Sequence, residues 1–289
     1  MTNIEAHIRA LESTSTLSTA LCGDGTMPFR TWHPLDDGQG RELIVMMHGG
    51  SGSWTHWYRN ISALSDNYEL VIPDLPALGD AASLPKGTEP QGVADIVAEG
   101  LRQVLGFRRF HLIAFSWGSV VASLAAPQLA SQVKSILLIG PASMGKMPKP
   151  MTMKRLMPRT EEMSVEEVSE VNRENLARLM FYDRHKIDAT ALTLQNINTA
   201  KARYNSPKYS QGDYVLAGLK NTTAKLLVIY GGEDAVAVPN LEEREARLKA
   251  VRPDANFEVR QDVGHWLQYE DANWFNGRVV EWIESNIVA

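Results

Sequence analysis

A serine between two small residues gives this chain its clearest candidate for nucleophilic chemistry. The stretch Phe110–Ser119 has the pattern of a buried strand, a sharp turn and the start of a helix, and Ser116 falls in the turn. Ala114 and Gly118 stand two residues before and two residues after it, which is the spacing of a nucleophile elbow. Such a turn presses the strand and helix backbones together, so the flanking side chains must be tiny. The turn also lifts the serine oxygen clear of the sheet edge, where we expect it to act as a nucleophile.

A carboxylate and an imidazole follow later strands of the predicted sheet. Asp234 comes soon after the apolar run Leu226–Tyr230, and His265 follows a shorter predicted strand. Loops at the carboxyl ends of parallel strands share one edge, so both side chains can approach Ser116. We expect His265 to take the proton from Ser116, and Asp234 to fix the imidazole tautomer and stabilise its charged form. Glu233 competes with Asp234 for this role, and we prefer Asp234 because it ends a Gly-x-x-Asp sequence before a proline-containing loop.

A glycine-rich loop after an earlier strand offers backbone donors for a developing negative charge. The apolar run at 42–47 predicts a strand, which leads into His48 and two glycines. We predict an oxyanion hole formed by the backbone N–H of Gly50, with Ser51 as the next candidate, and by the N–H of Trp117. His48 is interpreted as a structural residue that holds the loop through hydrogen bonds.

Length and composition predict one large globular domain with an insertion. The 289 residues are 44% hydrophobic, which suits a sizeable buried core. The net charge of −5 offers no basic face for nucleic acid and no attraction to anionic membranes. The single cysteine, Cys22, excludes an intrachain disulfide and fits a reducing compartment. We see no signal-peptide pattern and no apolar run of roughly 20 residues, so we expect a cytoplasmic protein.

Motifs for cofactors are missing from the sequence. It contains no P-loop, no G-x-G-x-x-G and no cysteine–histidine metal spacing. We therefore expect no cofactor and no metal, and a small-molecule substrate as the partner. The sequence leaves a homodimer open.

Strand and helix patterns alternate through the first half of the chain. This alternation predicts an α/β fold with a mostly parallel, doubly wound sheet covered on both faces. Residues 1–40 are expected to form short strands joined by glycine and proline turns. The other predicted strands lie near 42–48, 69–73, 109–114, 134–140, 225–231 and 257–260, and the predicted helices lie near 54–65, 91–105 and 117–129.

The alternating pattern stops between residues 143 and 212. This segment has no clear strand and two helical patterns, near 164–181 and 186–204, so we predict a helical lid inserted into a core made of 1–142 and 213–289. Flexible thioethers suit a surface that repacks around apolar ligands, although most of the methionines here are interpreted as filling the core of the lid. The lid holds seven of the eleven methionines: Met144, Met147, Met151, Met153, Met157, Met163 and Met180.

The elbow, the glycine-rich loop and the chain order serine, aspartate, histidine resemble the α/β-hydrolase superfamily over essentially the whole chain. Within it, Met47–Gly52, Tyr58–Ile61 and Gly264–Glu270 are similar to segments of the meta-cleavage-product C–C hydrolases. Those enzymes cut vinylogous 1,5-diketones from aromatic catabolism with a Ser–His–Asp triad. The resemblance therefore implies an α/β-hydrolase fold and hydrolytic chemistry.

The resemblance also implies a lid arginine near a substrate carboxylate. Arg203 is our candidate for that role, with Arg173 and Arg178 as rivals. The chain departs from the C–C hydrolases at two positions. Phe115 stands where that family usually has asparagine before the nucleophile, and Ala114 stands where it usually has glycine. Phe115 removes a polar group from the pocket, which favours a simple ester, lactone or thioester as the substrate.

These patterns predict a serine hydrolase that cleaves a small to medium apolar or aromatic ester through an acyl-enzyme. Ser51, Phe115 and Trp266 are expected to contact the substrate. The alternatives are a C–C hydrolase with the same triad, a non-hydrolytic ligand-binding protein on the same fold, and a perhydrolase or acyltransferase. The sequence Ser116–Ser119 also resembles the Asp-Trp-Gly-Ser of haloalkane dehalogenases, but that chemistry needs a carboxylate nucleophile.

Overall fold

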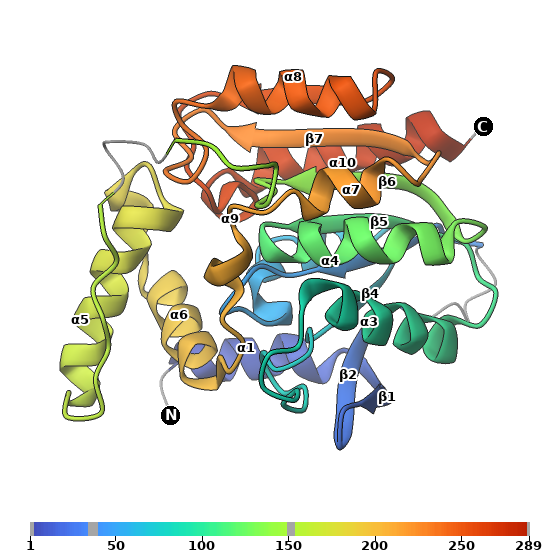
Figure 1. Ribbon diagram of the computed structural model, residues 1–289. Coiled ribbons are helices and arrows are strands. Elements are labelled where there is room, and N and C mark those ends of the chain that lie inside the picture. The colour runs from blue at the N-terminus through green and yellow to red at the C-terminus, as the bar shows by residue number, and fades with distance from the viewer. Residues whose placement is uncertain (1–2, 34–39, 149–153, 288–289) are drawn as a thin grey trace.

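An eight-stranded sheet forms the centre of the computed structural model, which describes residues 3–33, 40–148 and 154–287 (Figure 1). The strand order is β1-β2-β4-β3-β5-β6-β7-β8. β2 pairs antiparallel with β1 and with β4, and the remaining neighbours pair in parallel. The strands are β1 (Thr16–Cys22), β2 (Gly25–Trp32), β3 (Leu43–Met47), β4 (Glu69–Pro73), β5 (Phe110–Phe115), β6 (Val133–Ile139), β7 (Lys225–Gly231) and β8 (Asn256–Arg260).

Helices cover both faces of this sheet, which confirms the predicted α/β class. All residues of β3 and β5 are buried, and successive side chains enter different hydrophobic clusters. Val45 and Leu112 belong to the cluster that includes α3 and α4, whereas Ile44 and Ile113 belong to the one that includes α10. The helices are α1 (Asn3–Ser13), α2 (Ile61–Ser65), α3 (Pro90–Leu105), α4 (Trp117–Ala125), α5 (Val165–Asn175), α6 (Ala189–Lys201), α7 (Tyr214–Leu219), α8 (Leu241–Val251), α9 (Leu267–Glu270) and α10 (Ala272–Ile287).

The start of the chain differs from the sequence prediction. Short strands were expected over 1–40, but α1 precedes β1 and β2. Ile4, Ile8 and Leu11 recur at helical spacing and pack on the core, but only Ile8 is fully buried, and the prediction from glycine and proline turns overlooked this short pattern. The helix predicted over 54–65 is also interrupted, because a 3₁₀ turn at Trp54–Trp57 precedes α2.

The described residues between β6 and α7 form a cap beside the carboxyl ends of the strands (Figure 1). A capping box starts α5, in which the Ser164 hydroxyl accepts from the Glu167 N–H and the Glu167 carboxylate accepts from the Ser164 N–H. α5 runs on into a π-helical turn, Leu176–Met180. Asp188 caps α6 by accepting from the Ala191 N–H at 2.7 Å. Met144, Met147 and Met180 are buried, whereas Met151 and Met153 lie outside the described residues.

The second half of the cap is tied to the core by polar contacts. On α6, the buried Asn198 side chain bonds Ser53 Oγ at 2.7 Å and Thr55 Oγ1 at 3.0 Å. Both partners lie in the loop that follows β3. Further along, the Arg203 guanidinium donates to Ser83 Oγ at 3.0 Å and to backbone carbonyls of the loop that follows β4. These contacts hold the end of the cap against the core.

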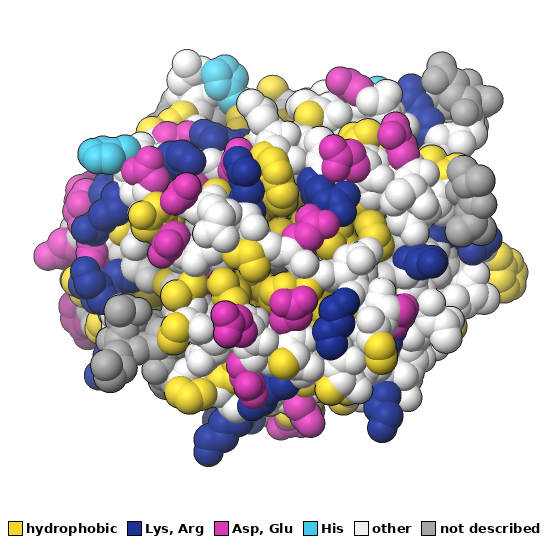
Figure 2. Space-filling model, turned by 90° about the horizontal axis from the view of Figure 1, so that it is seen from above, with side chains coloured by type: hydrophobic (Ala, Val, Ile, Leu, Met, Phe, Trp, Pro, Cys, Tyr) yellow, Lys and Arg dark blue, Asp and Glu magenta, His cyan; other side chains and the backbone are white. Residues whose placement is uncertain are grey.

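The surface carries charges of both signs. Figure 2 shows basic and acidic side chains interspersed over the face seen from above, without a large area of either sign. Among the described residues, no helix is long and apolar enough to cross a membrane.

Replacing Asn198 should destabilise the protein. Asn198→Ala leaves two buried hydroxyls without their amide partner, so we expect the free energy of unfolding to fall by about 1–3 kcal/mol. Urea denaturation measures this change. Asn221→Ala is the control, because Asn221 is exposed and, among the described residues, its side chain bonds only the Ala217 carbonyl. Equal stability of the two variants would contradict the predicted role of Asn198.

Candidate active site

The Ser116 turn has the backbone of a nucleophile elbow. Ser116 lies between β5 and α4 with φ +51° and ψ −112°, a conformation that residues with side chains rarely adopt. Its N–H donates to the Ile139 carbonyl at 2.8 Å. A Cβ on Gly118 would lie 2.5 Å from the backbone oxygens of Met47 and His48, so no larger residue fits there. The glycine two residues after Ser116 is therefore required by the close approach of these backbones.

Three of the predicted site residues come together at the carboxyl edge of the sheet. His265 Nε2 lies 2.9 Å from Ser116 Oγ, and His265 Nδ1 lies 2.7 Å from Asp234 Oδ2. Asp234 is fully buried, and its other carboxylate oxygen accepts from the Val236 N–H at 2.8 Å. Glu233, the competing acid, is exposed. The carboxylate thus holds the Nδ1–H of the imidazole, which leaves Nε2 free to accept the serine proton.

The loop that carries His265 is braced by its neighbours on both sides. The Gly264 N–H donates to Glu270 Oε2 at 2.8 Å, and the Trp266 N–H donates to the carbonyl of Met180 at 2.8 Å. The same Glu270 oxygen accepts from the Tyr182 N–H at 3.1 Å. Met180 and Tyr182 belong to the cap, so the cap and the histidine loop share hydrogen bonds.

The glycine-rich loop after β3 lies against the elbow. Gly50, Ser51 and Trp117 line the same cavity as Ser116, as the predicted oxyanion hole requires. Ser51 has φ +50°, which turns the backbone sharply at this point. The Gly50 and Trp117 N–H groups remain the predicted donors.

Two buried histidines hold this loop. His48 donates from Nδ1 to the Gly49 carbonyl at 2.8 Å and accepts at Nε2 from the Leu75 N–H at 2.8 Å, in agreement with its predicted structural role. His56 accepts at Nδ1 from the Gly49 N–H at 3.2 Å. Burial lowers the pKa of His48, and burial together with the nearby His48 and His265 holds the pKa of His56 well below its usual value. Both imidazoles are therefore neutral at pH 7.

A cavity of about 240 Å³ opens over Ser116 and His265, between the sheet edge and the cap. Its apolar lining comes from both parts of the chain and includes Phe115, Leu179, Met180 and Val236. The Phe115 ring also packs 5.0 Å from the His265 ring, measured between centroids. Polar cap side chains face the same space, among them Arg159, Asn175, Gln195, Thr199 and Ser206.

Of the predicted substrate-contacting residues, Ser51 and Phe115 line this cavity, and the other two do not. Trp266 is fully buried beneath the site, where its indole N–H donates to the His56 carbonyl at 3.0 Å. The Arg203 guanidinium is occupied by the loop after β4, as described above. Arg178, a rival of Arg203, donates to Glu174 at 2.8 Å and to the Arg155 carbonyl at 2.6 Å.

The cap arginine in the cavity is Arg159, which the sequence analysis missed. It donates to Asn172 Oδ1 at 2.9 Å, and although the residue is exposed at the rim of the cavity, partial desolvation lowers the pKa of its guanidinium. Arg159 lies before α5 in a stretch without helical or strand periodicity, so no pattern indicated its direction. Arg173, the remaining rival, does not line the cavity over Ser116.

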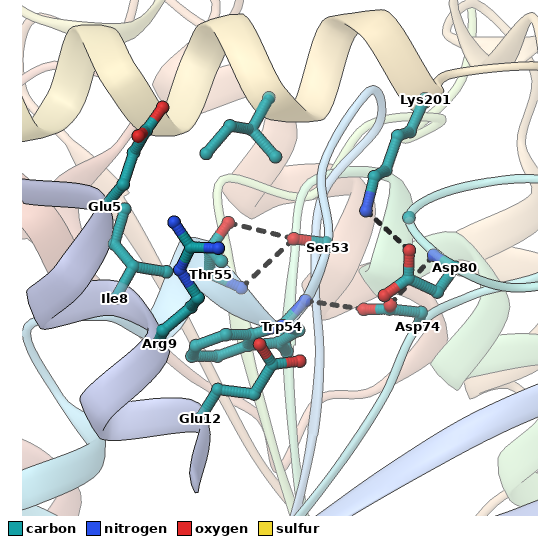
Figure 3. Close-up of a pocket in the computed structure, with 12 residues that line it drawn as sticks. Glu5, Ile8, Arg9, Glu12, Ser53, Trp54, Thr55, Asp74, Asp80 and Lys201 are labelled. Carbon is teal, nitrogen blue, oxygen red and sulfur yellow. Dashed lines mark hydrogen bonds and ion pairs between the residues drawn. The ribbon is translucent and has the colours of Figure 1, made fainter. Parts of the chain in front are cut away.

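A second cavity, of about 280 Å³, lies on the other side of α6 (Figure 3). Arg9 points into it from α1, and Trp54 forms part of its wall (Figure 3). Lys201 pairs with Asp80 at 2.6 Å, and Asp74 accepts from the Trp54 N–H at 2.8 Å. Its described lining contains no histidine or cysteine, and we assign no chemistry to it. α6 separates the two cavities, since Gln195 and Thr199 face the first while Ile197 and Lys201 face the second.

The fold and this geometry agree with a comparison against known protein families. Residues 44–278 match the alpha/beta hydrolase family. The chain belongs to this family. Its relatives include a 2-hydroxy-6-oxo-6-phenylhexa-2,4-dienoate hydrolase from Burkholderia cepacia, 26% identical over 94% of this chain and 97% of that one. A 2-hydroxy-6-oxononadienedioate/2-hydroxy-6-oxononatrienedioate hydrolase from Cupriavidus pinatubonensis is 28% identical over 97% of this chain and 99% of that one.

Solved structures share the fold of this alpha/beta hydrolase. An esterase from Rhodococcus sp. ECU1013 superimposes with a TM-score of 0.75 at 17% identity, covering 93% of this chain and 99% of that one. A meta-cleavage product hydrolase from Pseudomonas fluorescens IP01 gives a TM-score of 0.70 at 20% identity, covering 93% and 97%. Enzymes with different substrates thus share this architecture, and the protein is a hydrolase of this fold.

The buried histidines of this alpha/beta hydrolase should make it sensitive to acid. Burial also lowers the pKa of His111, so His48, His56 and His111 resist protonation in the folded state. Below about pH 6.5 the unfolded chain binds protons that the folded chain does not, so stability present above that pH is lost as the pH falls. We expect a loss of up to about 1.4 kcal/mol per pH unit for each histidine.

Urea denaturation between pH 8 and pH 5 measures this loss. His56→Gln keeps a hydrogen-bond acceptor but no longer titrates, so the slope of stability against pH should become shallower. His7→Gln is the control, because His7 is exposed on α1. A stability that is level or rises from pH 7 to pH 5 would contradict the expectation.

Proposed function

We propose that this protein is a serine hydrolase that cleaves a carboxylic ester or a related acyl compound through an acyl-enzyme. The observation that carries the proposal is the chain of two short contacts, Ser116 Oγ to His265 Nε2 at 2.9 Å and His265 Nδ1 to Asp234 Oδ2 at 2.7 Å. A serine hydroxyl alone is a weak nucleophile, and an adjacent base that is itself oriented by a carboxylate activates it. A non-hydrolytic ligand-binding protein on this fold can keep the same triad, so labelling and turnover, described below, separate the two functions.

The proposed reaction follows from these positions. Ser116 Oγ attacks the carbonyl carbon while His265 Nε2 takes the serine proton. The buried Asp234 stabilises the imidazolium, and the backbone N–H groups of Gly50 and Trp117 hold the oxyanion. His265 then protonates the leaving alcohol, and the acyl group remains on Ser116. Water, activated by the same imidazole, releases the acid and restores the hydroxyl.

The lining of the cavity supports an apolar or aromatic acyl compound. Phe115 lies next to the nucleophile, where a polar side chain could otherwise bind a second oxygen of the substrate. Leu179, Met180 and Val236 extend the apolar surface. A cavity of about 240 Å³ holds only part of a drug-sized ligand, so we expect small to medium esters.

Substitution of the triad tests the proposal. We expect a fluorophosphonate to add once to the wild-type protein, with the adduct on Ser116, because the imidazole activates that hydroxyl. Ser116→Ala and His265→Ala should abolish labelling and reduce kcat for p-nitrophenyl butyrate by at least about 10⁴-fold, and Asp234→Asn by about 10³- to 10⁴-fold. Intact-mass spectrometry and initial rates measure both effects. Ester hydrolysis that survives in Ser116→Ala would refute the proposal.

C–C bond hydrolysis is the second candidate, and the position of Arg159 at the cavity favours it. The relatives named above act on 2-hydroxy-6-oxo-dienoates, which carry a carboxylate. Arg159 faces the cavity and has an amide, not an acid, as its side-chain partner. A guanidinium that is bonded to a neutral amide keeps its positive charge available to pair with a substrate carboxylate.

The charge at Arg159 separates the two candidates. Arg159→Met keeps much of the apolar stem and removes the charge. For a C–C hydrolase we expect KM for a 2-hydroxy-6-oxo-dienoate to rise about 10-fold or more, while KM for neutral p-nitrophenyl butyrate stays within two-fold. Arg173→Met is the control on the cap outside the cavity. Steady-state kinetics on both substrates measure the difference, and equal effects of the two substitutions would remove the support for a carboxylate substrate.

A further inference from the structure

We propose that the hydroxyl of Ser206, in the cap, is a third hydrogen-bond donor to the oxyanion formed at Ser116. The inference rests on the proposed function and adds a catalytic residue to it. Ser206 lies about 90 residues beyond the nucleophile in the sequence, in a 3₁₀ turn, Ser206–Tyr209, that follows α6. No motif in the sequence marks it.

The Ser206 hydroxyl occupies the space beside Gly50. Ser206 Oγ lies 2.2 Å from the point that a Cβ on Gly50 would occupy, and Trp117 Cβ lies 3.6 Å from the same point. The hydroxyl thus lies beside Gly50 and shares a cavity with Trp117, and the N–H groups of these two residues are the predicted oxyanion donors. Glycine at position 50 is what allows this approach, because any side chain there would displace the Ser206 hydroxyl.

The hydroxyl is available for a ligand. Ser206 is only 8% exposed, and it lines the cavity that also contains Ser116 and His265. Most buried hydroxyls find a partner, but none of the hydrogen bonds within the described residues uses this side chain. By contrast, Ser53, Ser143 and Ser210 all use theirs on protein atoms. A buried donor that faces a reaction centre without a protein partner is arranged to serve the bound molecule.

The turn that carries Ser206 is held firmly enough to position a donor. Ser143, in the loop after β6, donates its N–H to the Ser210 carbonyl at 3.0 Å and its hydroxyl to the Tyr209 carbonyl. On the other side, the Tyr204 hydroxyl donates to the Thr88 carbonyl at 3.0 Å. Contacts before and after the turn thus come from the loop that precedes α3 in the core and from the first residues after β6. A donor fixed in this way needs no reorganisation when the negative charge forms.

Ser206→Ala tests the proposal through kcat and the affinity for a transition-state analogue, which a loss of packing alone would not lower selectively. Removing one oxyanion donor costs about 10²- to 10³-fold in kcat when two donors are present, so we expect a loss of about 10- to 100-fold for a third. KM for p-nitrophenyl butyrate should stay within two-fold. A boronic acid, which forms a tetrahedral anion on the serine, should bind the variant about 10-fold more weakly. Ser206→Cys nearly preserves the volume but donates poorly, and it should show the same losses.

The controls make failure of this inference distinguishable from failure of the proposed function. Ser169→Ala removes a cap hydroxyl outside both cavities and should match the wild type in kcat, KM and boronate affinity. An active wild type with an equally active Ser206→Ala would overturn the role of Ser206 alone, and so would a rise in KM with kcat unchanged. A wild type that neither hydrolyses esters nor reacts with the fluorophosphonate would overturn both.

Discussion

The close approach of α4 to the end of β3 is the constraint on which the rest of the site depends. The backbone at Gly118 leaves no space for a side chain beside the Met47 and His48 carbonyls, and the chain reaches that position through a turn with φ +51° at Ser116. A serine in this conformation costs about 1–3 kcal/mol. The buried contacts of β5 and α4 offset that cost, and the strained turn directs the hydroxyl toward His265.

This constraint explains how the sequence could indicate which residues lie together at the centre of the candidate site. The elbow, the glycine-rich loop and the loops after β7 and β8 each follow a buried strand, and parallel strands end at one edge of a sheet. Recognising the strands therefore placed Ser116, Asp234 and His265 near one another, although 149 residues separate the serine from the histidine. The α/β class could be predicted from the same alternation of strand and helix patterns, because the class is defined by the order of strands and helices along the chain.

The predicted residues that do not line the cavity differ from expectation in side-chain direction and in hydrogen-bond partners. Trp266 is adjacent to His265, but the loop that turns the imidazole toward Ser116 sends the next side chain into the core, against Tyr269. Arg203 lies on the cap as expected, yet its guanidinium reaches the loop after β4. Arg159 does reach the cavity, from a stretch without periodicity. Sequence patterns predict which face of a helix or strand is buried. The direction of a long side chain such as that of Arg203 depends instead on which loop of the folded chain offers hydrogen-bond acceptors.

The cap contributes hydrogen bonds to the proposed reaction centre and does not only cover it. The Met180 carbonyl of the cap accepts from the Trp266 N–H. The Tyr182 N–H of the cap and the Gly264 N–H both donate to the Glu270 carboxylate. Both neighbours of His265 are therefore bonded to the cap, either directly or through Glu270. Asn198 ties the cap to the loop that carries Gly50. Lifting the cap as one body would break these bonds, each worth about 0.5–1.5 kcal/mol, and would release the loops that hold the imidazole and the predicted oxyanion donors. The geometry therefore favours catalysis with the base of the cap in place.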